Sequence, residues 1–229
     1  MLDVCGCTAL EETDDNVEEA RAWLLKRGKA IAAKKAGREA NEGLVAYATS
    51  DSGSVGLLLE VNCETDFAAK NEAFHAYMAD IAQAGVDAVA GGGQDLVSAT
   101  PVDLDLALLG DLEDGLAALT LKIGEPLKVS RGVLLSGPGL AGYVHRASTG
   151  GSVNNVTLGK MGALVSVEDL SADELDAGLP TQLAQQIVGT QPGSMDDLLL
   201  QPFLFNPDLS VSQVLNDRTL TYTQLSVGL

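Results

Sequence analysis

Aromatic residues, cysteines, histidines and long apolar runs are all scarce in this chain of 229 residues. Phe, Trp and Tyr together make up 4% of the sequence, so a buried core must consist mainly of Leu, Val, Ile and Ala. No apolar run reaches the roughly 18–20 residues that a membrane-spanning helix requires, so we expect no membrane insertion. The chain is nevertheless 46% hydrophobic and 20% charged, which is typical of a globular protein.

Thiol and imidazole groups are too few for a disulfide framework or a simple metal centre. The three cysteines, Cys5, Cys7 and Cys63, are an odd number, and the first two have no second pair with which to complete a zinc site. His75 and His145 are the only histidines in the sequence. We therefore expect no metal, no cofactor and a reducing compartment.

Positive charge is scarce and unevenly distributed along the chain. Fourteen basic residues face 32 acidic ones, which gives a net charge of −18. Such a charge repels a phosphate backbone, so we expect no direct nucleic-acid partner. Seven of the basic residues lie between Arg21 and Arg38. This basic stripe could steer a protein partner or could be a solvated helix face, and charge alone does not decide between the two.

Motifs for covalent chemistry or nucleotide binding are missing from the sequence or stand in the wrong context. There is no Walker A sequence and no G-x-S-x-G elbow. Residues 137–142, Gly-Pro-Gly-Leu-Ala-Gly, match the dinucleotide pattern, but the segment that follows has the pattern of a strand and not of a helix. We interpret these glycines as a strand-to-strand turn, with a nucleotide-binding enzyme as the alternative. With two histidines available for acid–base work, the sequence is not typical of an enzyme.

The N-terminal residues 1–28 predict a small helical unit that is followed by a linker. Residues 8–12 and 17–27 have helical spacing with a polar, cap-forming break between them, and we expect Gly28 to end the second helix. Residues 29–41 open with alternating Ala and Lys, which have high helix propensity. We predict a basic helical linker there.

The rest of the chain contains an internal duplication. Residues 43–61 have the pattern of a β-hairpin, and residues 142–167 repeat this pattern with a longer polar loop. Gly56 in the first hairpin matches Gly162 in the second.

A helical pattern and then a strand candidate follow each of the two hairpins. We therefore predict an α+β fold with two related subdomains, residues 42–136 and 137–229, each a small antiparallel sheet covered by helices. The predicted helices are residues 71–84, 106–121 and 183–188, and the predicted closing strands are residues 126–135 and the tail after Ser210.

The connection between the first hairpin and the first core helix allows two interpretations of Phe67. Asn71 is a suitable N-cap for the helix, so the residues before it can form a projecting connection. Phe67 lies seven residues before Phe74, however, and a continuous helix from Thr65 would bury both rings on one face. The spacing taken alone favours a buried Phe67, and the exposed position stays open.

The same connection carries the most specific resemblance in the chain. Residues 60–67, Glu-Val-Asn-Cys-Glu-Thr-Asp-Phe, resemble the elongation factor Ts family, the guanine-nucleotide exchange factors for elongation factor Tu. The family core has two related subdomains, in agreement with the duplication, and residues 1–28 resemble part of its ubiquitin-associated-like N-terminal unit. Further similar motifs follow in the family's order: Met1-Leu-Asp-Val4, Lys34-Lys-Ala-Gly-Arg38, Lys122-Ile-Gly-Glu125, Tyr143-Val-His145, Gly159–Val165 and Gln201-Pro-Phe-Leu204.

The resemblance implies a function without chemistry of its own. In that family a Thr-Asp-Phe tip inserts into the GTPase near its Mg²⁺ and phosphate site, and the matching residues here are Thr65, Asp66 and Phe67. The implied partner is elongation factor Tu. The resemblance also implies partner contacts at Asn62, His145, Met1 and Leu2.

The resemblance further implies a cellular setting. Only eight residues separate Pro192 from Gln201, where bacterial members of the family carry a long helical hairpin, and the short form resembles mitochondrial members. We therefore expect translation elongation in the mitochondrial matrix, or in a plastid. The alternative is a structural subunit, derived from this family, of a larger organellar assembly.

Overall fold

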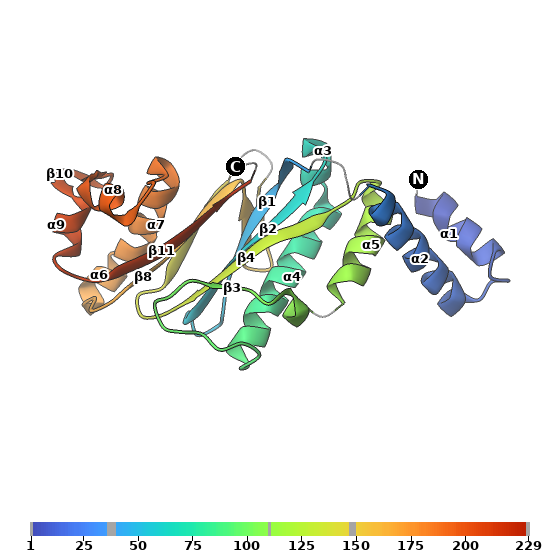
Figure 1. The fold of residues 1–229 in the computed structure, drawn as a ribbon, viewed down its shortest axis with the longest axis horizontal. Helices are drawn as coiled ribbons and strands as arrows, with labels where there is room; N and C mark the ends of the chain where they lie inside the picture. Colours follow the sequence, from blue (N-terminus) through green and yellow to red (C-terminus); the bar gives the residue numbers. More distant parts are fainter. Residues whose placement is uncertain (1, 36–39, 110, 147–149, 228–229) are drawn as a thin grey trace.

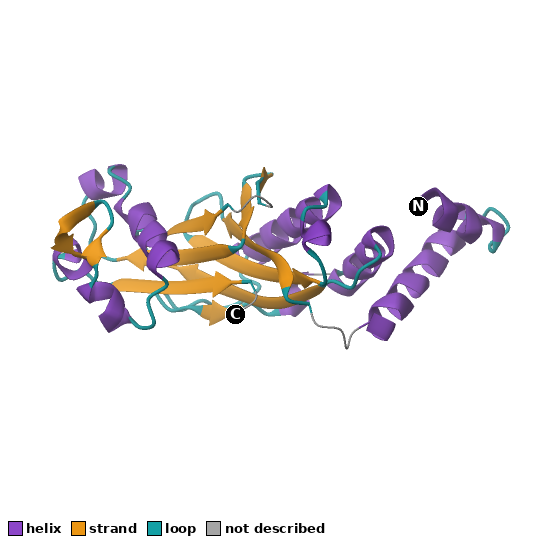
Figure 2. Ribbon diagram, turned by 90° about the horizontal axis from the view of Figure 1, so that it is seen from above, coloured by secondary structure: helices purple, strands orange, loops and turns teal. Residues whose placement is uncertain are grey.

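Two antiparallel sheets pack face to face at the centre of the molecule, and helices cover their outer faces (Figure 1, Figure 2). The computed structural model describes residues 2–35, 40–109, 111–146 and 150–227. From one side to the other, the layers are helix α4, the first sheet, the second sheet and helix α7. The predicted α+β class is confirmed.

The first sheet is built around the first predicted hairpin. Strand β1 (Glu42–Thr49) pairs with β2 (Val55–Cys63) along its whole length, from Glu42 opposite Cys63 to Thr49 opposite Gly56. The strand order is β3-β4-β2-β1-β7-β6. The other four strands are β3 (Val102–Asp103), β4 (Lys128–Ser136), β6 (Ser152–Val153) and β7 (Val156–Gly159).

The second sheet repeats the central part of the first. Strands β5 (Ala141–His145), β8 (Met161–Val167) and β11 (Leu220–Ser226) are ordered β11-β8-β5, which is the counterpart of β4-β2-β1 in the first sheet. The predicted strand 126–135 is β4, and the predicted strand in the tail is β11. The duplicated strand plan is therefore confirmed.

The loop of the second hairpin differs from the prediction. We expect a polar loop between β5 and β8, but the segment contains the ribbon β6–β7, and β7 pairs with β1 of the first sheet. Val156 and Leu158 of β7 are fully buried there. The ribbon covers backbone groups of β1 that would otherwise form an open sheet edge, and it adds apolar area to the core. Residues of the second predicted subdomain thus complete the sheet of the first.

The two sheets interlock around two glycines. A Cβ atom on Gly56 would lie 3.0 Å from Cδ2 of Leu164, and one on Gly162 would lie 2.9 Å from Cδ2 of Leu58. Because the two glycines occupy equivalent positions of the duplicated hairpins, each sheet accommodates a leucine of the other. The buried side chains between the sheets are Val45, Leu58, Leu135, Val144, Leu164 and Leu225.

The outer helices present apolar faces to the sheets. Helix α4 (Glu72–Ala90) packs on the first sheet and is capped by Asn71, as predicted, and α7 (Leu179–Thr190) packs on the second. The predicted helix 106–121 is divided into a 3-10 turn, η1 (Leu106–Leu109), and α5 (Leu112–Ile123). Glu113 and Asp114 lie in the first turn of α5, where acidic side chains favour a helix start.

Short elements complete the fold, and α8, α9 and the β9–β10 ribbon lie beyond the second sheet at the end of the molecule opposite the N-terminus (Figure 1). Among the residues that the structure describes, no helix is long and apolar enough to cross a membrane. The short elements are α3 (Asp66–Ala69), α6 (Ala172–Asp176), α8 (Met195–Leu200), β9 (Pro202–Phe203), β10 (Asn206–Ser210) and α9 (Val211–Leu215).

The N-terminal unit is a pair of helices, α1 (Leu2–Glu11) and α2 (Val17–Lys35), that docks on α5. The prediction that Gly28 ends the second helix is wrong, because α2 continues through Gly28 and includes the first part of the predicted linker. Gly28 has a packing role instead: it is buried, and a Cβ there would overlap the carbonyl group of Ala117. Residues 36–39 of the linker lie outside the described residues.

We expect Gly28→Ala to loosen the docking of α2 on α5. The added methyl group overlaps backbone atoms, which costs about 1–3 kcal/mol in a packed contact. Since basic residues are concentrated in α2, trypsin cleavage between Arg21 and Lys35 should become several-fold faster. Gly6→Ala is the matched control, because a Cβ on Gly6 has no neighbour within 4 Å. An unchanged cleavage rate in Gly28→Ala would contradict the packing role.

Candidate functional site

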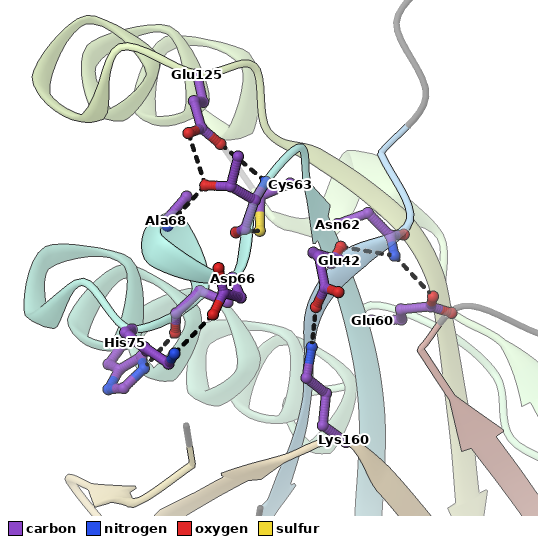
Figure 3. Close-up of polar contacts among 12 residues, drawn as sticks. Glu42, Glu60, Asn62, Cys63, Asp66, Ala68, His75, Glu125 and Lys160 are labelled. Carbon is purple, nitrogen blue, oxygen red and sulfur yellow. Dashed lines mark hydrogen bonds and ion pairs between the residues drawn. The ribbon is translucent and has the colours of Figure 1, made fainter. Parts of the chain in front are cut away.

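A short projecting connection, which we call the tip (residues 63–71), joins the first sheet to α4 (Figure 3). Strand β2 ends at Cys63, and Thr65 in extended conformation caps the four-residue helix α3. The Ala68 N–H donates to Thr65 Oγ1 at 3.3 Å. Asn71, again extended, then begins α4. The tip therefore contains the N-terminal caps of two successive helices, Thr65 for α3 and Asn71 for α4.

The Phe67 ring is exposed on this tip. It is 79% exposed, whereas the next two residues, Ala68 and Ala69, are 3% and 0% exposed. The break at Asn71 separates α3 from α4, so no continuous helix relates Phe67 to Phe74, and the seven-residue spacing does not place them on one face. The interpretation of Phe67 as a core residue is wrong, and the exposed position is confirmed.

Charge surrounds the exposed ring. Asp66 Oδ2 lies 2.6 Å from Lys70 Nζ, and the hydrogen bond from Lys70 lowers the pKa of the Asp66 carboxyl below its usual value. Lys70 Nζ also lies 5.8 Å from the centroid of the Phe67 ring, within range of a cation–π contact. The free tip thus displays an aromatic ring, an ionised carboxylate and the ammonium group that pairs with both.

The base of the tip is held by polar contacts from several segments. Both carboxylate oxygens of Glu125 accept hydrogen bonds from Thr65 (Figure 3). The Cys63 thiol donates to the Thr65 carbonyl at 3.2 Å, and His75 Nε2 lies 2.7 Å from the Ala69 carbonyl oxygen. Burial, together with the nearby charge of Glu125, raises the pKa of Cys63 to about 12, so this thiol stays protonated at neutral pH.

Glu125 is the residue of this site that sequence reasoning missed. In the sequence it stands only at the end of a motif, 60 positions after Thr65, and no spacing relates the two residues. The only sequence signal for Glu125 is its position after Gly124, because this glycine favours a helix end and so places the acidic residue in a turn.

Asn62 is also in the region of the tip, but its side chain is buried. It is 6% exposed, and its amide group donates to the Glu42 carbonyl at 3.3 Å and to Glu60 Oε1 at 3.0 Å. In the free protein it therefore ties the end of β2 to neighbouring groups of the sheet, and its contact with a partner stays a prediction. Leu2 is the first residue of α1, and Met1 and the Leu2 side chain lie outside the described residues.

His145 lies at the same end of the sheets as the tip. Its carbonyl accepts from the Lys160 N–H, Lys160 Nζ pairs with the Glu42 carboxylate at 2.5 Å, and Glu42 is the strand partner of Cys63. The His145 side chain is exposed. It borders a surface hollow of about 380 Å³ whose other lining residues include Tyr47, Tyr143 and Thr157.

The other candidate sites from the sequence have structural roles or are not formed. Residues 137–140 connect β4 to β5, and residues 141 and 142 begin β5, so the interpretation of these glycines as a strand-to-strand turn is confirmed. Within the described ranges, no group of three or more His, Cys, Asp or Glu side chains is arranged to hold a metal ion.

A comparison with known protein families matches the region that begins at the tip. The family model described as Elongation factor TS matches residues 64–197, more than half of the chain. The chain belongs to the elongation factor Ts family. The matched region contains Thr65, Asp66 and Phe67, includes strands of both sheets but not β1, β2 or β11, and ends within α8.

Several bacterial elongation factor Ts proteins are similar to this chain. Elongation factor Ts of Rhodopseudomonas palustris (strain TIE-1) is 39% identical over 199 residues, or 85% of this chain and 59% of that protein. The Jannaschia sp. (strain CCS1) protein is 36% identical over 203 residues, which cover 89% of this chain and 62% of that protein. The Chlorobaculum parvum protein is 35% identical over 187 residues, which cover 80% of this chain and 60% of that protein. The chain thus spans between 59% and 62% of the length of these relatives.

The two phenylalanines of this region should differ sharply in their effect on stability. We expect Phe74→Ala to lower the free energy of unfolding by about 3–5 kcal/mol, because Phe74 is fully buried. Phe67→Ala should change it by less than about 0.5 kcal/mol, because the ring is exposed. Urea denaturation of both variants measures the difference. A large loss in Phe67→Ala would show that the ring contributes to the core in solution.

Proposed function

We propose that the protein promotes the release of GDP from elongation factor Tu, with Thr65, Asp66 and Phe67 as the residues of the tip that insert into the GTPase. The observation that carries the proposal is the Phe67 ring, which is 79% exposed on a connection that is capped and held at its base. Single exposed apolar side chains are common on protein surfaces, so the support for the proposal is that contacts at the base of the tip hold this ring in one direction before a partner binds. Membership of the elongation factor Ts family supplies the identity of that partner.

The mechanism follows from binding to one conformation of the GTPase. A Phe ring that enters an apolar pocket gains roughly 1.5–3 kcal/mol and can act as an interface hot spot. If the pocket opens only when the Mg²⁺ and phosphate site is distorted, binding of the tip and binding of GDP oppose each other by the same factor. Asp66 adds a negative charge beside the phosphates and favours their departure. No covalent bond is made or broken, so the protein is not an enzyme on this proposal.

Additional contacts extend the proposed interface. His145 is exposed at the same end of the sheets as the tip, which supports a role in the same partner surface. We also propose contacts by the N-terminal residues Met1 and Leu2. Asn62 would act from its buried position, by holding the strand end from which the tip projects.

We further propose an organellar setting, in the mitochondrial matrix or a plastid. Its support is the short segment between Pro192 and Gln201, which holds the six-residue helix α8. One observation supports the alternative, a structural subunit of a larger organellar assembly: apolar side chains are also exposed far from the tip. There Leu200, Leu204 and Phe205 are 81%, 52% and 49% exposed.

A nucleotide-release assay tests the exchange function. Elongation factor Tu loaded with a fluorescent GDP analogue should lose it faster when micromolar protein and excess unlabelled GDP are added. Phe67→Ala should reduce the acceleration about tenfold or more, because the ring supplies roughly 1.5–3 kcal/mol of the interaction. Val97→Ala is the control: Val97 is 65% exposed, and it lies in the loop after the opposite end of α4. No acceleration by the wild-type protein would refute the proposal.

Co-purification from the source cells separates the two cellular roles. For an exchange factor, the tagged full-length protein should be recovered from the organelle as a heterodimer with elongation factor Tu, and GDP should dissociate it because the two binding events oppose each other. A structural subunit should instead be recovered in fixed stoichiometry with a large complex that GDP does not affect. Recovery outside organelles would refute the organellar setting.

A further inference from the structure

Glu125 and Thr65 make a two-point contact at the base of the tip. The Thr65 N–H donates to Glu125 Oε2 at 3.1 Å, and the Thr65 hydroxyl donates to Oε1 at 2.7 Å (Figure 3). Both oxygens of the carboxylate are therefore used on one residue, which fixes the direction of the Thr65 backbone as well as its side chain. Hydrogen bonds to a charged group are shorter and stronger than those between neutral groups.

The backbone beside Glu125 is itself held from two sides. Gly124 ends α5 in the left-handed conformation, with φ of 87°, and its N–H donates to the Thr120 carbonyl. The Gly124 carbonyl accepts from Lys35 Nζ of α2 at 2.6 Å. The carboxylate therefore extends from a turn that is tied both to α5 and to the N-terminal helices.

The charge of Glu125 sets the direction of the hydrogen bonds in the tip. An ionised carboxylate can only accept, so the Thr65 hydroxyl must donate to it. The lone pairs of the hydroxyl then remain free to accept from the Ala68 N–H, which is the bond that caps α3. A helix of four residues has little stability of its own, so the orientation of α3 and of its Phe67 ring depends on this cap.

We propose that Glu125 is a positioning residue, which orders the tip before it meets a partner by fixing Thr65 at the start of α3. The inference rests on the proposed exchange function and adds a residue that does not touch the partner's pocket itself. A tip that is already ordered loses less conformational entropy on binding, so the contact acts on affinity. Phe67 and Asp66 remain the groups that act on the bound GTPase.

The experiment combines GDP release with amide hydrogen exchange. Release from elongation factor Tu is measured over a range of protein concentrations, so that the half-saturating concentration and the maximal rate are obtained separately. We expect Glu125→Ala to raise the half-saturating concentration about tenfold and to leave the maximal rate within about twofold. In Glu125→Ala without a partner, the Thr65 and Ala68 amides should exchange about tenfold faster than in the free wild-type protein.

Matched variants distinguish positioning from a general effect on the fold. Glu125→Gln should have a smaller effect, because its one carbonyl oxygen can still accept from Thr65. In the free protein, Thr65→Val should speed amide exchange at Ala68 as Glu125→Ala does, because it removes the hydroxyl that accepts from the Ala68 N–H. Asp80→Asn, which removes an exposed carboxylate of α4, is the control and should have no effect.

Each outcome decides one of the two proposals. If Phe67→Ala impairs release but Glu125→Ala behaves as the wild type, the positioning role is overturned and the exchange function stands. If the wild-type protein does not accelerate release, the exchange function fails, and unchanged amide exchange in Glu125→Ala overturns the positioning role independently. A loss of stability in Glu125→Ala as large as that in Phe74→Ala also overturns it, because the residue then supports the whole fold.

Discussion

The contact between the two sheets is the constraint on which the rest of the molecule depends. Every residue of β2 is buried, because α4 covers one face of the strand and the second sheet covers the other. Leu58 lies against Gly162 and Leu164 lies against Gly56, so the two sheets approach closely. A shift of β2 by one residue would exchange its two buried sets of side chains and would destroy both packings. The end of β2 is therefore a rigid base.

The tip takes its geometry from this base. Since Cys63 is fixed by strand pairing and burial, the few residues that follow have little freedom, and their caps direct α3. Small buried alanines face the core, and the ring of Phe67 is left on the opposite side of the turn. The stability of the fold and the exposure of the ring are thus compatible, because the residues that support the tip differ from those that it displays.

The N-terminal helices contribute to the same end of the molecule. Helix α2 docks on α5 through Gly28 and the Lys29–Asp114 ion pair, and Lys35 reaches the turn that precedes Glu125. The ion pair is exposed at the surface, so the docking depends mainly on the close packing. The path from α2 through α5 to the tip consists of direct contacts, although the segments are far apart in the sequence.

Local patterns in the sequence determined the hairpins, the helix caps and the duplicated strand plan, because turn residues, periodicity and capping act within a few positions. Asn71 as the cap of α4 and the turn before β5 at residues 137–140 are examples. Only the tertiary structure decided that α2 continues through Gly28, that β7 joins the first sheet, and that Phe67 is exposed. The first two depend on what packs against a segment from a distant part of the chain. The exposure of Phe67 depends on the break at Asn71 and on Glu125, 60 positions after Thr65. Periodicity along one segment carries no information about such contacts.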